Sequence, residues 1–471
     1  MKTVFTLIAL SFYSIINAQS GKLDTSFGVN GKVQSNSRFQ NYFYPVKALL
    51  QSDDKIIVAG KYQLTHNPKN PFGFFASRYT VDGILDKSFG NGGTKLIQTD
   101  YAPYAASAVI QNDNKILIAG YAFSVFPNRY IGIIIRLNAN GSLDTSFGAD
   151  KNGFLLQSKT NSFGALAIQS DNKIISLSGR NDSNFINRFL PDGTLDLTFG
   201  KNGFVQIDNY KAFFTCTVQQ NGKFILSGYY YPQGGAFRKI CLQRFLPNGS
   251  IDKSFGNNGT VITQYNDDAL VYDVALQSDK KIIATGQTSI YNSNTTNFAT
   301  LRYNENGSVD SSFGINGMVT TIFRIAYSSS NSVIVQKNGD ILIGGYAANK
   351  NNGDFAIVKL KPNGKADKTF GVSGEVITHF SAPSMISTLL LQKNEKIIAG
   401  GNSQNYQLPN ITLACYNNEI ISNQELINNN TQVSVLNKVF IYPNPALNSL
   451  HIEVYLQRKT QQSLLLILRV I

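Results

Sequence analysis

Two short phrases recur along this chain and constrain its fold more than any other feature. The first is close to Leu-Asp-x-Ser-Phe-Gly-x-Asn-Gly and returns at intervals of 52 to 62 residues. Its seven copies begin at Leu23, Leu85, Leu143, Leu195, Ile251, Val309 and Ala366. The second phrase lies between them, as in Gln51-Ser-Asp-Asp-Lys-Ile-Ile-Val-Ala-Gly60. A period of this length is typical of one supersecondary unit that stacks on copies of itself.

Each repeat reads as four short strands. In the fifth unit, residues 271–277, 281–285, 298–303 and 318–322 have the alternating or β-branched pattern of strands. Asn306-Gly307 precedes the fourth strand and suits a two-residue hairpin, because both positions tolerate positive φ. Six repeats carry such a turn, which starts at Asp82, Asn140, Asp192, Asn248, Asn306 and Asn363.

Four antiparallel strands in each unit of about 57 residues suit the blade of a β-propeller. The chain starts with an orphan phrase and strand, Leu23 to Gln34, and its repeats finish near Tyr416 after three strands. Pairing of residues 31–34 with the blade at 385–416 would close a ring and satisfy strand-edge hydrogen bonds. The sequence therefore predicts an all-β, seven-bladed propeller over residues 19–416, with four antiparallel strands per blade and the N-terminal strand joined to the last blade.

Both phrases resemble delta-60 repeats, a bacterial family regarded as forming β-propellers. The resemblance covers residues 21–416, and seven copies of the motif support it. It implies the propeller fold and no general activity.

The two ends of the chain read as export signals. Residues 1–18 combine Lys2, an apolar run and Ile16-Asn-Ala18 before Gln19, as in a secretory signal peptide whose apolar core is too short to span a membrane. Residues 417–436 are rich in Asn and read as a linker. Within residues 437–471, the run Val439-Phe-Ile-Tyr-Pro-Asn-Pro-Ala446 resembles the start of the C-terminal sorting domain of the type IX secretion system of Bacteroidetes. The later strands, glycine turn and basic end of that family are replaced, so the domain is partial.

These signals imply a secreted protein or one at the outer-membrane surface, with the type IX secretion machinery as a partner and without a membrane span. We expect a monomer.

The net charge of +13 could indicate an acidic partner such as nucleic acid. Twelve of the 42 basic residues instead recur with the repeat, as Arg78, Arg136, Arg188, Arg244, Arg302, Lys359, Lys55, Lys115, Lys173, Lys223, Lys281 and Lys396. Because no dense basic run remains, we predict no binding to nucleic acid. The cysteines Cys216, Cys241 and Cys415 form no disulfide framework and are expected to be free and buried.

The recurring residues of the first phrase have a structural and a functional interpretation. Its aspartates could bind calcium, but each copy offers one carboxylate, so capping of backbone amides with help from the Arg eight residues earlier is favoured. Its phenylalanines could stack on a ligand, but seven equivalents around a ring favour wedges between blades. The residues are Asp24, Phe27, Asp86, Phe89, Asp144, Phe147, Asp196, Phe199, Asp252, Phe255, Asp310, Phe313, Asp367 and Phe370. We expect neither a metal nor a cofactor.

Catalytic residues are scarce. The chain has three histidines, His66, His379 and His451, and none of the glycine-rich nucleotide loops or nucleophile elbows. Loop carboxylates such as Asp267, Asp268 and Asp354 leave open a polysaccharide-degrading hydrolase or lyase with carboxylates at the propeller channel. A structural adhesin component is a third possibility.

Function on a ring scaffold is expected in the loops that vary between repeats. These loops are rich in Tyr and Asn, and rigid amphipathic rings beside amide groups suit recognition of a glycan or a protein. The candidate ligand-binding residues are Tyr62, Tyr121, Tyr229, Tyr230, Tyr231, Tyr291, Tyr346 and Tyr406. We expect an extracellular binding module and no catalytic residues, and the long loop Lys61–Gly73 is the first candidate for a partner contact.

Overall fold

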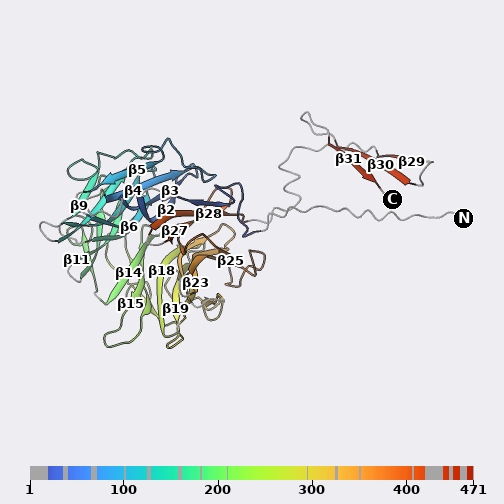
Figure 1. Cartoon of the computed structure of the whole chain (residues 1–471). Coiled ribbons are helices and arrows are strands. Elements are labelled where there is room, and N and C mark those ends of the chain that lie inside the picture. The colour runs from blue at the N-terminus through green and yellow to red at the C-terminus, as the bar shows by residue number, and fades with distance from the viewer. Residues whose placement is uncertain are drawn as a thin grey trace. The chain divides into compact units, whose positions relative to one another are not determined.

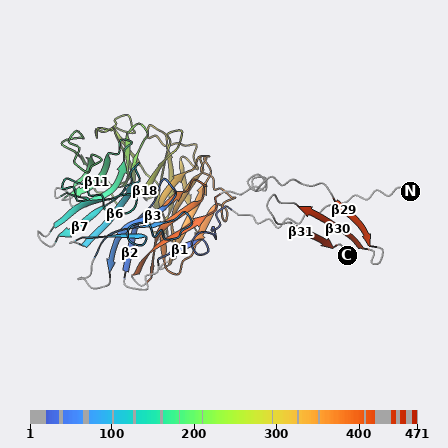
Figure 2. The same cartoon turned by 90° about the horizontal axis from the view of Figure 1, so that it is seen from above.

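The computed structural model describes residues 20–35, 41–64, 72–99, 102–124, 129–157, 162–180, 183–208, 210–293, 295–323, 327–349, 352–405, 408–418, 439–444, 449–456 and 464–469. Residues 1–18, which read as a signal peptide, lie outside this part of the chain, as do residues 419–436 of the predicted linker. Residues Ser20–Asn418 form one compact unit (Figures 1 and 2). That unit consists of seven four-stranded antiparallel sheets, which confirms the predicted seven-bladed propeller.

The first four blades follow one another along the chain. Blade 1 consists of β2 (Asn41–Leu50), β3 (Ile56–Leu64), β4 (Phe72–Tyr79) and β5 (Thr94–Gln98). Blade 2 consists of β6 (Ala102–Ile110), β7 (Ile116–Ser124), β8 (Arg129–Leu137) and β9 (Phe154–Gln157). Blade 3 consists of β10 (Ser162–Ile168), β11 (Ile174–Arg180), β12 (Ser183–Phe189) and β13 (Phe204–Ile207). Blade 4 consists of β14 (Lys211–Val218), β15 (Phe224–Tyr230), β16 (Lys239–Phe245) and β17 (Thr260–Thr263).

The last three blades bring the chain back to its start. Blade 5 consists of β18 (Asp268–Leu276), β19 (Ile282–Ser289), β20 (Asn297–Tyr303) and β21 (Met318–Thr321). Blade 6 consists of β22 (Tyr327–Val335), β23 (Ile341–Asn349), β24 (Asn352–Leu360) and β25 (Glu375–Thr378). Blade 7 consists of β26 (Ser384–Leu391), β27 (Ile397–Asn405), β28 (Leu408–Tyr416) and the N-terminal β1 (Lys32–Gln34).

The ring is closed on both its inner and its outer side. The first strands of neighbouring blades contact one another around the whole circle, including β26 with β2, and Figure 1 shows β27 and β28 beside β2 and β3. On the outer side β1 pairs antiparallel with β28, in the register Lys32↔Ala414. The outermost strand of blade 7 therefore comes from the opposite end of the repeat region, as the sequence predicts.

Closure extends to the hairpin turn that blade 7 lacks. In the other blades, the glycine that follows the phenylalanine of the first phrase donates its N–H to the hairpin turn of the next blade. Gly256, for example, donates to Asn306 O at 2.8 Å. Gly371 of blade 6 donates instead to Ser20 O at 2.8 Å, and Gly21, with φ +86°, takes the place of the turn glycine. Asn417 then pairs with residues 21 and 22 through two backbone hydrogen bonds. The compact unit thus runs to Asn418, two residues beyond the predicted boundary, because the missing turn is built from two chain segments.

The phrase phenylalanine lies between blades. Phe255 is fully buried, and its ring lies beside Gly307 of the next blade, where a Cβ would come within 2.9 Å of a ring carbon. The guanidinium of Arg244 lies 4.5 Å from the centroid of the same ring. The corresponding phenylalanines are all at most 1 % exposed.

The aspartate of the first phrase accepts hydrogen bonds from its own turn and from the arginine on the third strand of the blade. Asp86 Oδ1 accepts hydrogen bonds from the backbone N–H and the hydroxyl of Ser88, and Asp86 Oδ2 accepts one from Arg78 Nε at 2.9 Å. Arg78 also donates to Ala139 O of the next blade at 2.9 Å. Hydrogen bonding from Ser88, aided by Arg78, lowers the pKa of Asp86 to about 2. At Asp144 burial opposes ionisation, but the equivalent bonds prevail and lower its pKa to about 2.

All seven phrase aspartates have a lowered pKa, so the propeller should lose stability in acid. A carboxylate whose folded pKa is depressed stabilises the fold above its unfolded pKa, and this contribution is lost as the pH falls from about 4 towards 2. We expect the melting temperature, followed by circular dichroism, to drop by on the order of 10 °C over this interval. The variant Asp252→Asn should have a lower melting temperature than the unaltered protein at pH 7. Its melting temperature should also change less with pH. Equal melting temperatures at pH 6 and pH 2.5 would contradict this role.

A bulge in the first strand explains the glycine that ends the second phrase. In blade 5 the register shifts between Val271 and Asp273, and Gly286 lies opposite this bulge. A Cβ on Gly286 would lie 2.0 Å from the carbonyl oxygen of Leu270, so no larger residue fits. The same close approach occurs at Gly60, Gly120, Gly228, Gly345 and Gly401.

The three cysteines are free and buried. Strand β15 separates Cys216 on β14 from Cys241 on β16. Burial raises the pKa of the Cys241 thiol to about 12, so this thiol stays protonated.

The C-terminal segment contains a separate three-stranded antiparallel sheet. It consists of β29 (Val439–Asn444), β30 (Ser449–Leu456) and β31 (Leu464–Arg469), in the order β29-β30-β31. The stretch that resembles a sorting domain forms the first pair, with Tyr442 opposite His451. Within the part of the chain that the structure describes, no helix is long and apolar enough to cross a membrane.

Candidate functional site

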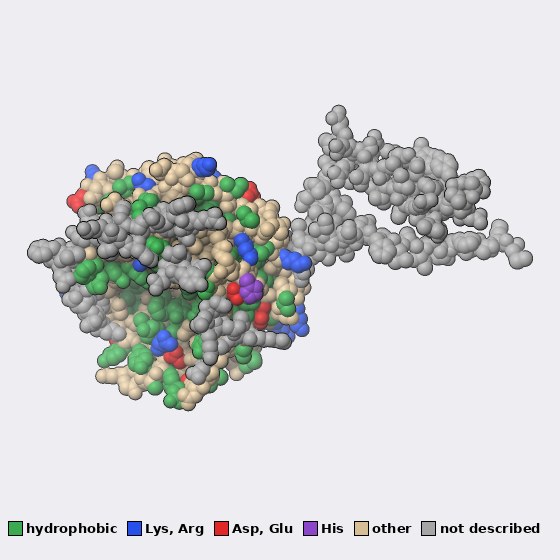
Figure 3. Space-filling view, viewed as in Figure 1, with side chains coloured by type: hydrophobic (Ala, Val, Ile, Leu, Met, Phe, Trp, Pro, Cys, Tyr) green, Lys and Arg blue, Asp and Glu red, His purple; other side chains and the backbone are tan. Residues whose placement is uncertain are grey.

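The repeated and the variable residues lie at opposite ends of the blades. Successive strands are antiparallel, so the turns after the first and third strands share one end, and these turns carry the two phrases. The connections after the second strand and after the fourth strand share the other end, which we call the variable face. On the face of the molecule shown in Figure 3, charged side chains are scattered among hydrophobic and uncharged ones.

A groove of about 430 Å³ lies on the variable face, between residues of blades 4, 5 and 6. We call it the tyrosine groove, and its walls include Tyr231, Phe237, Arg238, Asp268, Tyr291 and Tyr327. Tyr231 is 46 % and Tyr291 65 % exposed, so their rings are open to solvent. The structure thus brings together two tyrosines that the sequence singled out, 60 residues apart in the chain.

An ion pair supports the wall of this groove. Arg238 Nε donates to both carboxylate oxygens of Asp268, at 3.0 and 3.2 Å, and the Arg238 backbone N–H donates to Oδ1 at 2.8 Å. The hydrogen bond that Arg238 donates to Asp268 raises the pKa of Arg238 above its usual value, so this pair stays ionised. Because Arg238 precedes β16 and Asp268 begins β18, the pair fixes blade 4 to blade 5. Its opposite charges neutralise each other, which leaves a groove suited to an uncharged, hydroxyl-rich ligand.

Tyr291 is held in place by one contact to its backbone and one to its ring. Asp267 Oδ2 accepts a hydrogen bond from the Tyr291 backbone N–H at 2.7 Å. Phe237 packs edge to face with Tyr291, with ring centroids 5.4 Å apart. A ring that is fixed before binding loses little conformational entropy when a ligand stacks on it. Asp267 and Asp268, considered in the sequence as candidate catalytic carboxylates, therefore hold the groove together.

Aromatic residues continue from the groove towards the innermost strands. The Arg238 guanidinium lies 5.6 Å from the ring of Tyr229. Phe214 is 43 % exposed at the bulge of β14 and packs against both Tyr229 and Tyr272, with centroids 5.8 and 5.1 Å apart.

One position of the blade, directly after the glycine opposite the bulge, is partly exposed in six blades. Its residues are Lys61, Tyr121, Tyr229, Gln287, Tyr346 and Asn402. Each lies directly across from a residue of the innermost strand, as Tyr121 does from Tyr104. Polar and aromatic side chains therefore surround the inner part of the variable face.

Three of the predicted ligand-binding residues, Tyr62, Tyr230 and Tyr406, are not exposed tyrosines of the described variable face. Tyr62 is a correction, because it is 3 % exposed and belongs to the hydrophobic core shared by blades 1 and 7. The strand β3 runs to Leu64 and so turns Tyr62 inward when Lys61 faces outward. Tyr406 lies outside the described residues, as do residues 65–71 of the long loop. Tyr230 is half-buried at the end of β15.

Sequence reasoning missed Phe237, Arg238 and Tyr327 of the groove. No repeat marks them, and they adjoin Tyr231 and Tyr291 only through contacts between blades. Their one signal in the sequence is that they stand where the repeats differ in length and composition.

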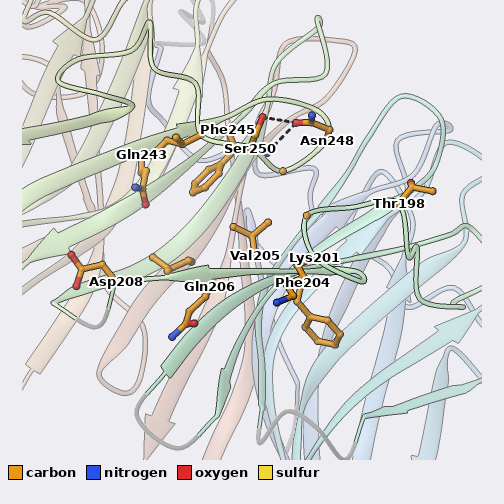
Figure 4. A pocket seen from close by; sticks show the side chains of 14 residues that line it. Thr198, Lys201, Phe204, Val205, Gln206, Asp208, Gln243, Phe245, Asn248 and Ser250 are labelled. Carbon is orange, nitrogen blue, oxygen red and sulfur yellow. Dashed lines mark hydrogen bonds between the residues drawn. The ribbon is translucent and has the colours of Figure 1, made fainter.

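A second groove, of about 510 Å³, lies between blades 3 and 4 (Figure 4). Its walls are β13, β16 and the turn at Asn248, where Asn248 Oδ1 accepts a hydrogen bond from the Ser250 hydroxyl at 2.7 Å. Val205 and Phe245 line it. These residues recur in the repeats. The groove is therefore a space between two neighbouring blades and is not formed by variable residues.

Two other carboxylates on the propeller have notable surroundings. His379 Nδ1 lies 2.8 Å from Asp354 Oδ2, and Asp273 lies at the bulge of β18, where burial raises its pKa. Asp273 Oδ2 accepts a hydrogen bond from the backbone N–H of Val333 in the next blade, at 3.0 Å. In the described ranges no three His, Cys, Asp or Glu side chains gather in a way that could hold a metal ion.

Comparison with known proteins supports the fold. The model of a family described as "Domain of unknown function (DUF5122) beta-propeller" matches residues 111–147, 219–255, 277–313 and 336–370. Each match starts at the glutamine of the second phrase and ends at the phenylalanine of the first. No curated protein matches the chain at the level of sequence.

Several solved structures match this chain at low identity. Drosophila Plexin A, solved in complex with Semaphorin 1b, is 9 % identical over 85 % of this chain and 88 % of that one, with a TM-score of 0.44. The propeller domain of the Trilobed protease from Pyrococcus furiosus is 7 % identical over 82 % and 98 %, with a TM-score of 0.45. The polysaccharide lyase Uly1 is 9 % identical over 86 % and 98 %, with a TM-score of 0.45. The chain is a β-propeller, and four of its segments are similar to the DUF5122 propeller family.

Proposed function

We propose that this propeller is an exported binding module that recognises a glycan through the tyrosine groove on its variable face. One observation carries the proposal. Exposed Tyr231 and Tyr291 stand in a groove beside hydroxyl and amide side chains, including Asn292, Ser293 and Thr295. Aromatic faces pack against the C–H groups of a sugar, and the neighbouring polar groups can bind its hydroxyls.

Binding should depend on the two exposed rings. We expect the double variant Tyr231→Ala, Tyr291→Ala of the full chain to bind its glycan about tenfold or more weakly, since each ring contact contributes on the order of 1 kcal/mol. A glycan-array screen identifies the ligand, and titration calorimetry then measures the loss.

The matched control is Ile315→Ala. Ile315 is 81 % exposed but lies at a phrase turn, away from the variable face. Its removal should leave both affinity and melting temperature unchanged. Failure of every glycan on the array to bind, or equal affinity of the double variant and the unaltered protein, would reject the groove as a glycan site.

A polysaccharide-degrading enzyme is the second candidate. The pair His379–Asp354 favours it, because a carboxylate at 2.8 Å from Nδ1 orients an imidazole for proton transfer. Release of oligosaccharides from a bound glycan, lost in His379→Ala, would identify this activity.

Export is part of the proposal. The signal-like residues 1–18 and the resemblance of residues 439–453 to a type IX sorting domain support an address at the cell surface or outside the cell. N-terminal sequencing of the exported protein, expected to begin at Gln19, tests the first signal.

A further inference from the structure

A group of residues on blades 1 and 2 carries a positive charge that no carboxylate of the described residues neutralises. We call it the lysine–tyrosine cluster, and it consists of Tyr44, Lys61, Tyr104, Tyr121 and Tyr130. Lys61 Nζ lies 4.5 Å from the centroid of the Tyr44 ring and 5.5 Å from that of Tyr104. Burial alone lowers the pKa of Lys61, and no carboxylate among the described residues forms an ion pair with it.

This arrangement differs from that of the lysines that recur with the repeat. Lys55 lies 3.4 Å from Asp86, and Lys115 lies 3.2 Å from Asp144, so those charges are compensated within the fold. A half-buried ammonium that contacts only aromatic rings recovers part of its lost hydration through cation–π attraction. Lys61 therefore offers an anion a site that is already partly desolvated in the free protein.

The tyrosines beside Lys61 form a platform. Tyr104 and Tyr121 stack with centroids 5.0 Å apart and an angle of 18° between their planes, and Tyr130 meets Tyr121 edge to face at 5.3 Å. Tyr104 is 49 % and Tyr130 48 % exposed, so both present ring surface to solvent. The platform is fixed by backbone pairing, because Tyr104 on the innermost strand lies directly across from Tyr121.

We propose that the lysine–tyrosine cluster binds a uronic acid unit of an acidic glycan. The ammonium of Lys61 takes the sugar carboxylate, and the exposed tyrosine rings pack against the C–H groups of the pyranose. An acidic peptide would supply the carboxylate but no rigid C–H face to match the platform, so the sugar is favoured. The inference extends the proposed glycan recognition to a second site, which shares no residue with the tyrosine groove.

Titration calorimetry on the full chain tests the charge. The probes are tetrasaccharides of galacturonic, glucuronic and mannuronic acid, each paired with its carboxyl-reduced neutral counterpart. We expect at least one acidic tetrasaccharide to bind about tenfold or more tightly than its neutral counterpart, as a charge-assisted hydrogen bond allows. Lys61→Met should remove this preference and leave the neutral affinity unchanged, and Lys61→Arg should restore it.

The control variant is Lys87→Met, since Lys87 is an exposed lysine at a phrase turn and its loss should change nothing. Tyr104→Ala should weaken the acidic and the neutral sugar alike. Melting curves of all variants report whether the fold is intact.

Three results would overturn the inference. They are the absence of a preference for any acidic sugar, an unchanged preference in Lys61→Met, and equally tight, Lys61-dependent binding of tetraglutamate. Tyr291→Ala separates this inference from the proposed function. Loss of all glycan binding in Tyr291→Ala, with Lys61→Met unaffected, would leave the tyrosine groove as the site and eliminate the cluster.

Discussion

Removal of residues 20–34 is expected to open the ring and lower the melting temperature by roughly 10 °C or more. The segment supplies β1 and the buried ring of Phe27. It also supplies Ser20 and Gly21, which replace the hairpin turn that blade 7 lacks. It also joins blade 7 to blade 1, because Gly28 donates to Asp82 O at 2.8 Å. One buried phenylalanine contributes about 1.5–3 kcal/mol and each hydrogen bond about 1 kcal/mol, so the total loss is on the order of 5–10 kcal/mol.

The exposed edge of β28 should also make the truncated protein associate with itself, since an unpaired strand edge pairs with other chains. Scanning calorimetry and light scattering measure the two effects. The matched control lacks only residues 1–19 and should melt like the full chain. A truncated protein that stays monomeric and melts at the same temperature as this control would show that the N-terminal strand does not seal the ring.

Phe255→Ala is expected to lower the free energy of unfolding by about 3–5 kcal/mol. The ring of Phe255 is fully buried among side chains of blades 4 and 5, and it touches the hairpin turn of the next blade at Gly307. Its removal leaves a cavity between two rigid sheets, which cannot collapse to fill it. It also removes the surface on which Arg244 lies, at 4.5 Å from the ring centroid.

Denaturant unfolding at equilibrium measures this loss, and Phe214→Ala is the matched control. Phe214 is 43 % exposed on β14, so its replacement should cost about 1 kcal/mol or less. Equal stability of Phe255→Ala and the unaltered protein would show that the phenylalanine of the first phrase does not stabilise the packing between blades.

The strands were predictable because the repeat states each local pattern seven times. In blade 5 the expected third strand, 298–303, corresponds to β20, and the expected fourth, 318–322, to β21. The first strand begins at Asp268 and not at residue 271, because the bulge at Tyr272 shifts the alternation of side chains by one residue. A bulge of one residue reverses which face a pattern points to, so the pattern alone places the start of the strand too late.

The variable face was predictable as a region but not residue by residue. Tyr62 and Tyr121 were both candidate ligand-binding residues, but Tyr121 corresponds to Lys61, and β3 directs Lys61 to the surface and Tyr62 into the core. The groove needed Phe237 and Tyr327 as well as the predicted Tyr231 and Tyr291, and these come from three blades. Contacts between non-repeating residues leave no periodic trace in a single sequence.

By itself the sequence determined the number of blades, the turn chemistry and the way in which the ends of the repeat region complete each other. These properties depend on interactions within one repeat or between neighbouring repeats. Each can be recognised from a short sequence pattern that recurs. Only the tertiary structure decided that Tyr231 and Tyr291 share a groove, that Arg238 is neutralised by Asp268, and that Lys61 lies among tyrosines with no ion-pair partner in the described part of the chain. Those outcomes depend on the direction of individual side chains and on the packing of neighbouring blades, which arise only when the ring has closed.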